Sequence, residues 1–148
     1  MIRPATRYDI PRLLEFVEAY AYANPIQSLG DPQRHDPAHV EKLLFEIISG
    51  RGFALIDEEM RGTLIAVKQK NIWCPTIVEL HELLWWVDPE HRSGTVGGRL
   101  WKKFDDLAEG MMNRGEINIV YSSVSASGPL IDYTKRGYKG MGASFFRE

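Results

Sequence analysis

The spacing of apolar residues changes along the chain and divides it into helical and extended segments. Helical spacing occurs in three segments. The first follows the capping box Thr6-x-x-Asp9, the second begins at Asp36-Pro37, and the third begins at Val96. Their apolar stripes are Ile10, Leu13, Leu14, Val17 and Ala21; Val40, Leu43, Leu44, Ile47 and Ile48; and Val96, Leu100, Phe104, Leu107 and Met111. The pattern predicts three long amphipathic helices.

Other segments have the composition and the flanking turn signals of strands. They are 52–57 (GFALID), 62–70 (GTLIAVKQK), 76–87 (TIVELHELLWWV) and 117–124 (INIVYSSV). Short links make the first three antiparallel, whereas the third helix separates the last two and predicts a parallel pair. We also expect an N-terminal strand, a short helix over 129–136, and one or two strands in 138–148. The sum is a mixed α/β sheet, mostly antiparallel, with one parallel pair near its middle and about four helices.

Composition narrows the class of protein. A chain of 148 residues suits a single domain over 1–148, and 44% hydrophobic with 26% charged residues is typical of a soluble globular protein. The apolar runs are too short for a membrane span, and the N-terminus lacks a signal-peptide core, so we expect a cytoplasmic location. Cys74 is the single cysteine, which excludes an internal disulfide and a cysteine-built zinc site. The net charge of −2 argues against a broad nucleic-acid surface.

A glycine-containing loop, VDPEHRSGTVGGRL (87–100), joins the third strand to the third helix. A helix N-terminus behind such a loop offers backbone N–H groups and a positive dipole end to an anion, usually a phosphate. The loop lacks the Gly-Lys-Ser/Thr of a P-loop and the G-x-G-x-x-G of a dinucleotide fold. A plain strand-to-helix turn is the alternative interpretation.

Three stretches, in order, resemble the GNAT superfamily of N-acetyltransferases over essentially the whole chain. They are IRPATRYDI (2–10), the loop 87–100, and LIDYTKRGYK (130–139). The loop is similar to the family's acyl-CoA pyrophosphate loop, Gln/Arg-x-x-Gly-x-Gly/Ala, with Arg92 first, Gly97 sixth and Thr95 in place of the middle glycine. A register that starts at His91 recovers Gly94 but loses both ends. The last stretch is similar to the family's Tyr-x-x-x-Gly-Phe/Tyr.

This resemblance implies an acetyl-CoA-dependent N-acetyltransferase that needs no metal. The pantetheine arm would insert between the splayed parallel strands and contact the main chain near 85–87, where an N–H near Val87 would stabilise the oxyanion. The diphosphate would lie on the loop amides, and Arg92 or Arg99 either adds charge or is a solvated helix-end arginine. The expected coenzyme-binding residues are Trp85, Trp86, Val87, Arg92, Ser93, Gly94, Thr95, Val96, Gly97, Gly98, Ser122 and Ser123. Trp85 and Trp86 should point to opposite faces of the strand.

Direct acetyl transfer to a primary amine needs a neutral amine, although a free alkylamine has a pKa near ~10. A carboxylate can take that proton, and Glu82 is the expected base because it lies nearer the catalytic end of its strand, with Glu79 as the second candidate. Either residue is also interpretable as an ordinary strand-face charge. The resemblance implies that Tyr133 protonates the departing thiolate, whereas packing on the sheet is its alternative role.

Two departures from the family pattern support a second hypothesis. Thr95 replaces a glycine, and Ser-Ala-Ser-Gly at 125–128 stands where relatives often have an asparagine that contacts coenzyme A. The alternative is therefore a non-catalytic CoA-binding or scaffolding module on the same fold. Nothing in the sequence identifies the acceptor, a small-molecule or peptide amine, or the preferred acyl group, and a homodimer stays open.

Overall fold

A five-stranded sheet forms the centre of the fold in the computed structural model, which describes residues 1–123 and 131–148. The strands are β1 (Ile2–Pro4), β2 (Gly52–Asp57), β3 (Gly62–Lys70), β4 (Val78–Val87) and β5 (Ile119–Tyr121), and they lie in this order. Strands β1 to β4 pair antiparallel, and β5 pairs parallel with β4. The expected mixed, mostly antiparallel sheet is confirmed.

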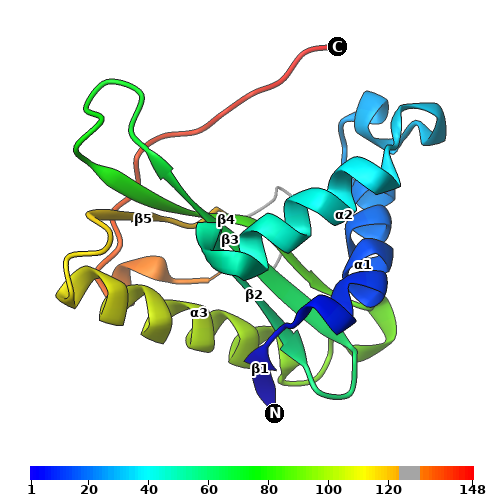
Figure 1. The fold of residues 1–148 in the computed structure, drawn as a ribbon, viewed down its shortest axis with the longest axis horizontal. Helices are drawn as coiled ribbons and strands as arrows, with labels where there is room; N and C mark the ends of the chain where they lie inside the picture. Colours follow the sequence, from blue (N-terminus) through cyan, green and yellow to red (C-terminus); the bar gives the residue numbers. More distant parts are fainter. Residues whose placement is uncertain (124–130) are drawn as a thin grey trace.

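Helices cover both faces of this sheet (Figure 1). Helices α1 (Ile10–Ala23) and α2 (Pro37–Glu46) lie on one face, and α3 (Val96–Asn113) lies on the other. The capping box predicted at Thr6 and Asp9 is present, and the Asp36 side chain accepts a hydrogen bond from the N–H of His39 at the start of α2. These contacts satisfy N–H groups that a helix start leaves without partners.

Alternate residues of the central strands face two separate cores. Leu55 and Leu64 contact the α3 side, whereas their neighbours Ile56 and Ile65 contact the side of α1 and α2. All four are almost completely buried. Because a slip of one residue would exchange the two faces, this double burial fixes the register of the sheet.

The alternation is interrupted once, by a β-bulge in β4. Ile65 of β3 lies opposite Leu84, and the next residue, Ala66, lies opposite Glu82, so Leu83 is the extra residue. Leu80 consequently joins the core beneath α3, while Leu84 joins the core beneath α1 and α2. The bulge changes the face to which every later side chain of β4 points.

The C-terminal part of the chain departs from the expectation. The parallel pair lies at the edge of the sheet rather than near its middle, because residues 137–148 form no strand in the described part of the chain. A 3₁₀ turn at Tyr133–Arg136 stands where a helix was expected, with residues 124 and 129–130 outside the described residues. Gly137 and Gly142 have positive φ values of 82° and 122°, a conformation that interrupts both strands and helices.

No helix in 1–123 or 131–148 is long and apolar enough to cross a membrane.

Candidate active site

Strands β4 and β5 diverge at the centre of the candidate site. Their pairing ends at His81 and Tyr121, while β4 continues to Val87. Asp88 N–H donates to the carbonyl of Arg61, so the antiparallel alternation turns the main-chain groups of Trp85 and Val87 away from β3, toward the side that β5 has left. We call this region, β4 from 82 to 87 with Ser122 and Ser123, the fork.

Glu82 lies where the fork opens. Its Oε2 accepts a hydrogen bond from the N–H of Ser123, at 3.0 Å, and another from Oγ of Ser122, at 3.3 Å. Burial raises the pKa of the Glu82 carboxyl, and the two hydrogen bonds oppose that rise. Oε1 has no hydrogen-bond partner in the part of the chain that the structure describes. This carboxylate therefore has one oxygen available and a raised affinity for a proton.

Glu79 has a different environment, in the paired half of β4. Its carboxylate accepts hydrogen bonds from Nδ2 of Asn71 at 2.8 Å and the hydroxyl of Tyr121 at 3.0 Å, and lies 3.2 Å from Nε2 of His81. These hydrogen bonds, with that of Asn71 the largest cause, lower the pKa of Glu79 to about 2. A group that acidic accepts a proton poorly, and both of its oxygens have partners.

Tyr133 reaches the same region from the 3₁₀ turn. Its ring packs edge-on against Trp101, with 5.5 Å between ring centroids, and also against Tyr138. Its hydroxyl is buried and has no hydrogen-bond partner among the described residues. Burial raises the pKa of Tyr133, the Ser122 hydroxyl opposes that shift, and the negative charge of Glu82 adds to it. The phenol therefore keeps its proton at neutral pH, and Ser122 is a shared neighbour of Glu82 and Tyr133.

A hollow of about 330 Å³ lies at the N-terminus of α3. It is lined by Arg61, Glu90, His91, Ser93, Gly94, Thr95, Val96 and Arg99. The first helical hydrogen bond runs from the N–H of Arg99 to the carbonyl of Thr95, and within the described residues the N–H groups of 95–98 have no partner. Such a set of unpaired donors at a helix start suits an anion. Gly94 lies on the wall, whereas a Cβ on Gly97 would face Val87 and Trp85.

The two arginines of this region have different surroundings. The guanidinium of Arg92 stacks on Trp86, 4.5 Å from the ring centroid, and its Nε donates to the carbonyl of Val87 at 2.8 Å. Arg99 has no ion-pair partner among the described residues and lines the hollow. The Arg92 side chain thus occupies a main-chain acceptor of the fork, while Arg99 is available to an anion.

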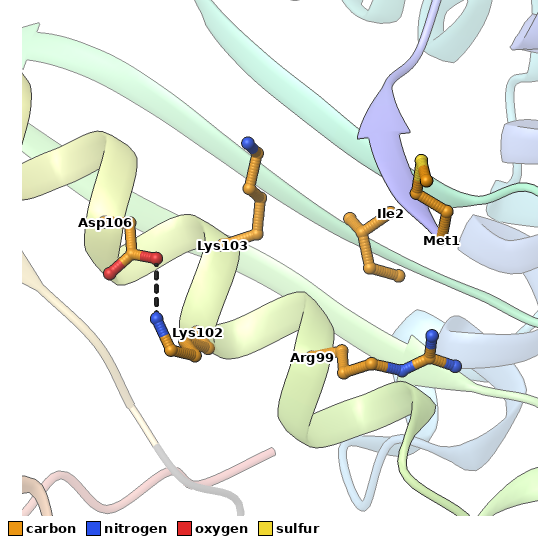
Figure 2. Close-up of a pocket in the computed structure, with 6 residues that line it drawn as sticks. All are labelled: Met1, Ile2, Arg99, Lys102, Lys103 and Asp106. Atoms are coloured by element: carbon orange, nitrogen blue, oxygen red, sulfur yellow. Dashed lines mark hydrogen bonds and ion pairs between the residues drawn. The ribbon is translucent and has the colours of Figure 1, made fainter.

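Arg99 also lines a second, open hollow of about 540 Å³ between α3 and β1 (Figure 2). Met1 and Ile2 of the N-terminus contribute to it, as do Lys102, Lys103 and Asp106. Lys102 is paired with Asp106 at 2.9 Å, whereas Lys103 has no ion-pair partner in the described chain. Basic side chains therefore continue from the start of α3 along its next turns.

The structure places the expected tryptophans as predicted and adds a third. Trp85 packs on the core beneath α3 and Trp86 on the opposite core, so their opposite orientation is confirmed. Sequence reasoning missed Trp101, which is buried in α3 and donates from Nε1 to Oγ of Ser122 at 3.2 Å. The only signal for it is general, because a buried indole N–H needs an acceptor.

Solved structures share this arrangement of strands and helices. A predicted acetyltransferase from Clostridium acetobutylicum, solved with acetyl-CoA, superimposes with a TM-score of 0.71 at 14% identity, over 100% of this chain and 95% of the other. A GCN5-related N-acetyltransferase from Ralstonia eutropha superimposes with a TM-score of 0.69 at 18% identity, over 100% of this chain and 97% of the other. This chain has the GNAT fold. No family model and no curated protein matches the sequence.

An aminoglycoside acetyltransferase from an uncultured soil metagenomic sample, in complex with sisomicin, also has the GNAT fold. It gives a TM-score of 0.64 at 13% identity, over 100% of this chain and 95% of the other. At identities this low the likeness establishes the fold, which confirms the expectation drawn from the three sequence motifs. The residues of the site are assigned from this chain's own contacts.

Proposed function

We propose that this chain is a single acyltransferase domain that moves the acetyl group of acetyl-CoA to a primary amine. The observation that carries the proposal is the fork, where the Glu82 carboxylate and the buried Tyr133 phenol flank Ser122. Within the described residues, one oxygen of Glu82 and the hydroxyl of Tyr133 have no hydrogen-bond partner. The hollow at the start of α3 supports it, since the open main chain of β4 leads toward that helix. The GNAT fold of several acetyltransferases agrees with this assignment.

The chain's own groups fit the parts of coenzyme A. The amides of 95–98 and the guanidinium of Arg99 would hold the diphosphate, because they are donors without partners in the described chain. The outward main-chain groups of Trp85 would pair with the amides of the pantetheine arm, as an added strand pairs with a sheet edge. The carbonyl of Val87 already accepts from Arg92, so Trp85 offers the unoccupied pairing position.

Two residues would handle the protons of the reaction. Oε1 of Glu82 takes a proton from the acceptor amine, whose nitrogen forms the new amide bond as the carbon–sulfur bond of the thioester breaks. The Tyr133 hydroxyl gives its proton to the departing thiolate. Glu79 is not the proton acceptor in this scheme, because its pKa is about 2 and its carboxylate is hydrogen-bonded to Asn71 at the β3–β4 turn.

Binding and turnover test the proposal separately. Acetyl-CoA should raise the melting temperature and give a calorimetric binding isotherm, because a ligand of the folded state stabilises that state. Thiol release should then be measured with aminoglycosides, polyamines and short peptides as acceptors. Binding together with turnover on one class supports the transferase, whereas binding without turnover on any of them favours the non-catalytic module. Absence of binding at millimolar acetyl-CoA would contradict both.

A further inference from the structure

The contacts of Trp101 extend the site beyond the two proton-handling groups. Its indole N–H lies 3.2 Å from Oγ of Ser122, and this Oγ lies 3.3 Å from Oε2 of Glu82. An indole N–H can only donate, while a serine hydroxyl has one proton to give and two acceptor positions. The indole must therefore donate to Ser122, and because an ionised carboxylate can only accept, the Ser122 hydroxyl donates to Glu82.

The fixed direction determines how the carboxylate is held. Oε2 of Glu82 receives two donors, the Ser122 hydroxyl and the N–H of Ser123, and Oε1 receives none among the described residues. The carboxylate is thus anchored through one oxygen and presents the other. Because Ser123 donates from the main chain of the segment that follows β5, the anchor also joins the two sides of the fork.

We propose that Trp101 and Ser122 are positioning residues that anchor Oε2 of Glu82, so that Oε1 faces the acceptor amine as an ionised base. This inference rests on the proposed function. Trp101 acts only through Ser122, and Ser122 acts only through Glu82, so neither is a catalytic residue. A purely structural tryptophan would fill the same volume with no effect on the titration of Glu82.

The other groups that sense the charge of Glu82 do not titrate near neutral pH. Tyr20, from α1, has a pKa raised by burial and by the charge of Glu82, and Tyr133 has a raised pKa with burial as the first cause. His81 is the neighbouring residue of β4, but its ring lies against Glu79 and stacks on Tyr121. A proton uptake observed at the carboxyl carbon of Glu82 is therefore attributable to that carboxyl.

Carboxyl carbon NMR of the free protein tests the anchor without any acceptor. The Ser122→Ala variant loses a donor to the ionised carboxylate, so we expect the midpoint of Glu82 to rise by about one pH unit. The Trp101→Phe variant keeps the Ser122 hydroxyl but frees its orientation, so we expect a smaller rise, of about half a unit. Ser122→Thr keeps a hydroxyl and should restore the wild-type midpoint. Phe104→Leu, which opens the core next to Trp101 without removing a donor, should lower the melting temperature and leave the midpoint unchanged.

Kinetic measurements distinguish the hypothesis that Trp101 and Ser122 position Glu82 from the hypothesis that Glu82 is the base. With the best acceptor of the panel, kcat/KM should fall on the acidic side of its pH profile as Glu82 takes up a proton. This acidic limb should move to higher pH in Ser122→Ala and disappear in Glu82→Gln. An unchanged midpoint of Glu82 in both Ser122→Ala and Trp101→Phe would overturn the anchor while leaving the base in place. An acidic limb that persists in Glu82→Gln would overturn the base, and with it the anchor. Since Ser122→Ala removes a single hydroxyl and leaves the Trp101 ring in the α3 core, it keeps the test decisive if Trp101→Phe fails to fold.

Discussion

Glu79 and Glu82 lie three residues apart on β4, yet the two halves of the strand give them opposite properties. In the paired half, the side chains of Asn71, His81 and Tyr121 surround Glu79 and lower its pKa to about 2. At the fork, burial raises the pKa of Glu82, and one of its oxygens has no partner in the described chain. Both residues are glutamates, so the difference comes from their surroundings: hydrogen bonds lower the pKa of Glu79, and burial raises the pKa of Glu82.

The partners of Glu79 indicate a structural role. Asn71 donates to Glu79, and its own Oδ1 accepts the N–H groups of Trp73 and Cys74 in the β3–β4 turn. The carboxylate therefore holds the β3–β4 turn through Asn71. Glu82 has only the anchor described above, so its removal should affect chemistry more than folding.

The largest effect that would sharpen this comparison is expected from Tyr133→Phe. The substitution removes a hydroxyl that has no hydrogen-bond partner in the described chain, so packing against Trp101 and affinity for acetyl-CoA should survive. Turnover should fall by roughly 10²-fold or more if the phenol protonates the thiolate. Steady-state thiol release and calorimetry on the same preparation check both statements. Unchanged turnover would return Tyr133 to a packing role and remove the acid from the fork.

The next effect concerns the hollow that the fork leads into. Gly94→Val adds a branched side chain to its wall, where the Cβ position makes only an ordinary contact with the carbonyl of His91. We expect the Kd for acetyl-CoA to rise about tenfold, corresponding to about 1.4 kcal/mol, with the fold intact. Gly110→Ala at the far end of α3 is the matched control and should bind as the wild type does. Equal affinities for Gly94→Val and Gly110→Ala would place the diphosphate elsewhere.

A smaller effect is expected from charge. Arg99→Ala removes a cation that lines both hollows, so the affinity for acetyl-CoA should fall about threefold at low salt, and by less as salt screens the phosphates. Arg51→Ala removes an arginine in the helical turn that follows α2, lining neither hollow, and serves as the control. Calorimetry at two salt concentrations measures the difference. A salt dependence that is identical in the two variants would exclude Arg99 from the anion site.

The smallest expected effect is on the stability that Glu79 contributes in the half of β4 that pairs with β5. Because the pKa of Glu79 is lowered from its ordinary 4.5 to about 2, its ionised form stabilises the folded state fully above pH 4.5, and this stabilisation is lost as pH falls toward 2. Glu79→Gln should therefore lower the melting temperature by a few degrees at pH 7. The melting temperatures of the variant and the wild type should become equal as the pH approaches 2. Thermal unfolding across this range measures it. A melting-temperature difference that grows on acidification would contradict the assigned direction.

The sequence predicts most of this fold because its signals are local. Strands β2 and β3 have the predicted bounds, and α3 begins at Val96 as predicted, since turn residues flank those ends. The bulge at Leu83 leaves no such signal: the run from 83 to 87 is apolar throughout and has no alternation that could show a change of face. The parallel pair lies at the sheet edge because 138–148, where one or two strands were expected, forms none.

The sequence predicts which residues belong to the candidate site but not which side chains contact one another there. Glu82, Glu79 and Tyr133 could be named in advance because proton transfer needs titratable groups on the strand and turn concerned. Their ranking depends on side-chain contacts that residue types do not reveal, such as Ser122 to Glu82, 40 residues apart, and Asn71 to Glu79 across the β3–β4 turn. Trp101 was missed for the same reason, since it lies on α3 and its partner, Ser122, follows β5.

The pH dependence of kcat/KM in Glu82→Gln and Glu79→Gln, measured with one acceptor, tests the central claim most directly. Glu82 must be ionised to accept a proton, so the wild-type rate should fall as pH drops through its raised pKa. We predict that Glu82→Gln loses at least about 10²-fold in kcat/KM at neutral pH, together with the acidic limb, whereas Glu79→Gln retains both limb and rate. The opposite pattern, with the limb lost in Glu79→Gln and kept in Glu82→Gln, would contradict the assignment of the reactive carboxylate to the fork.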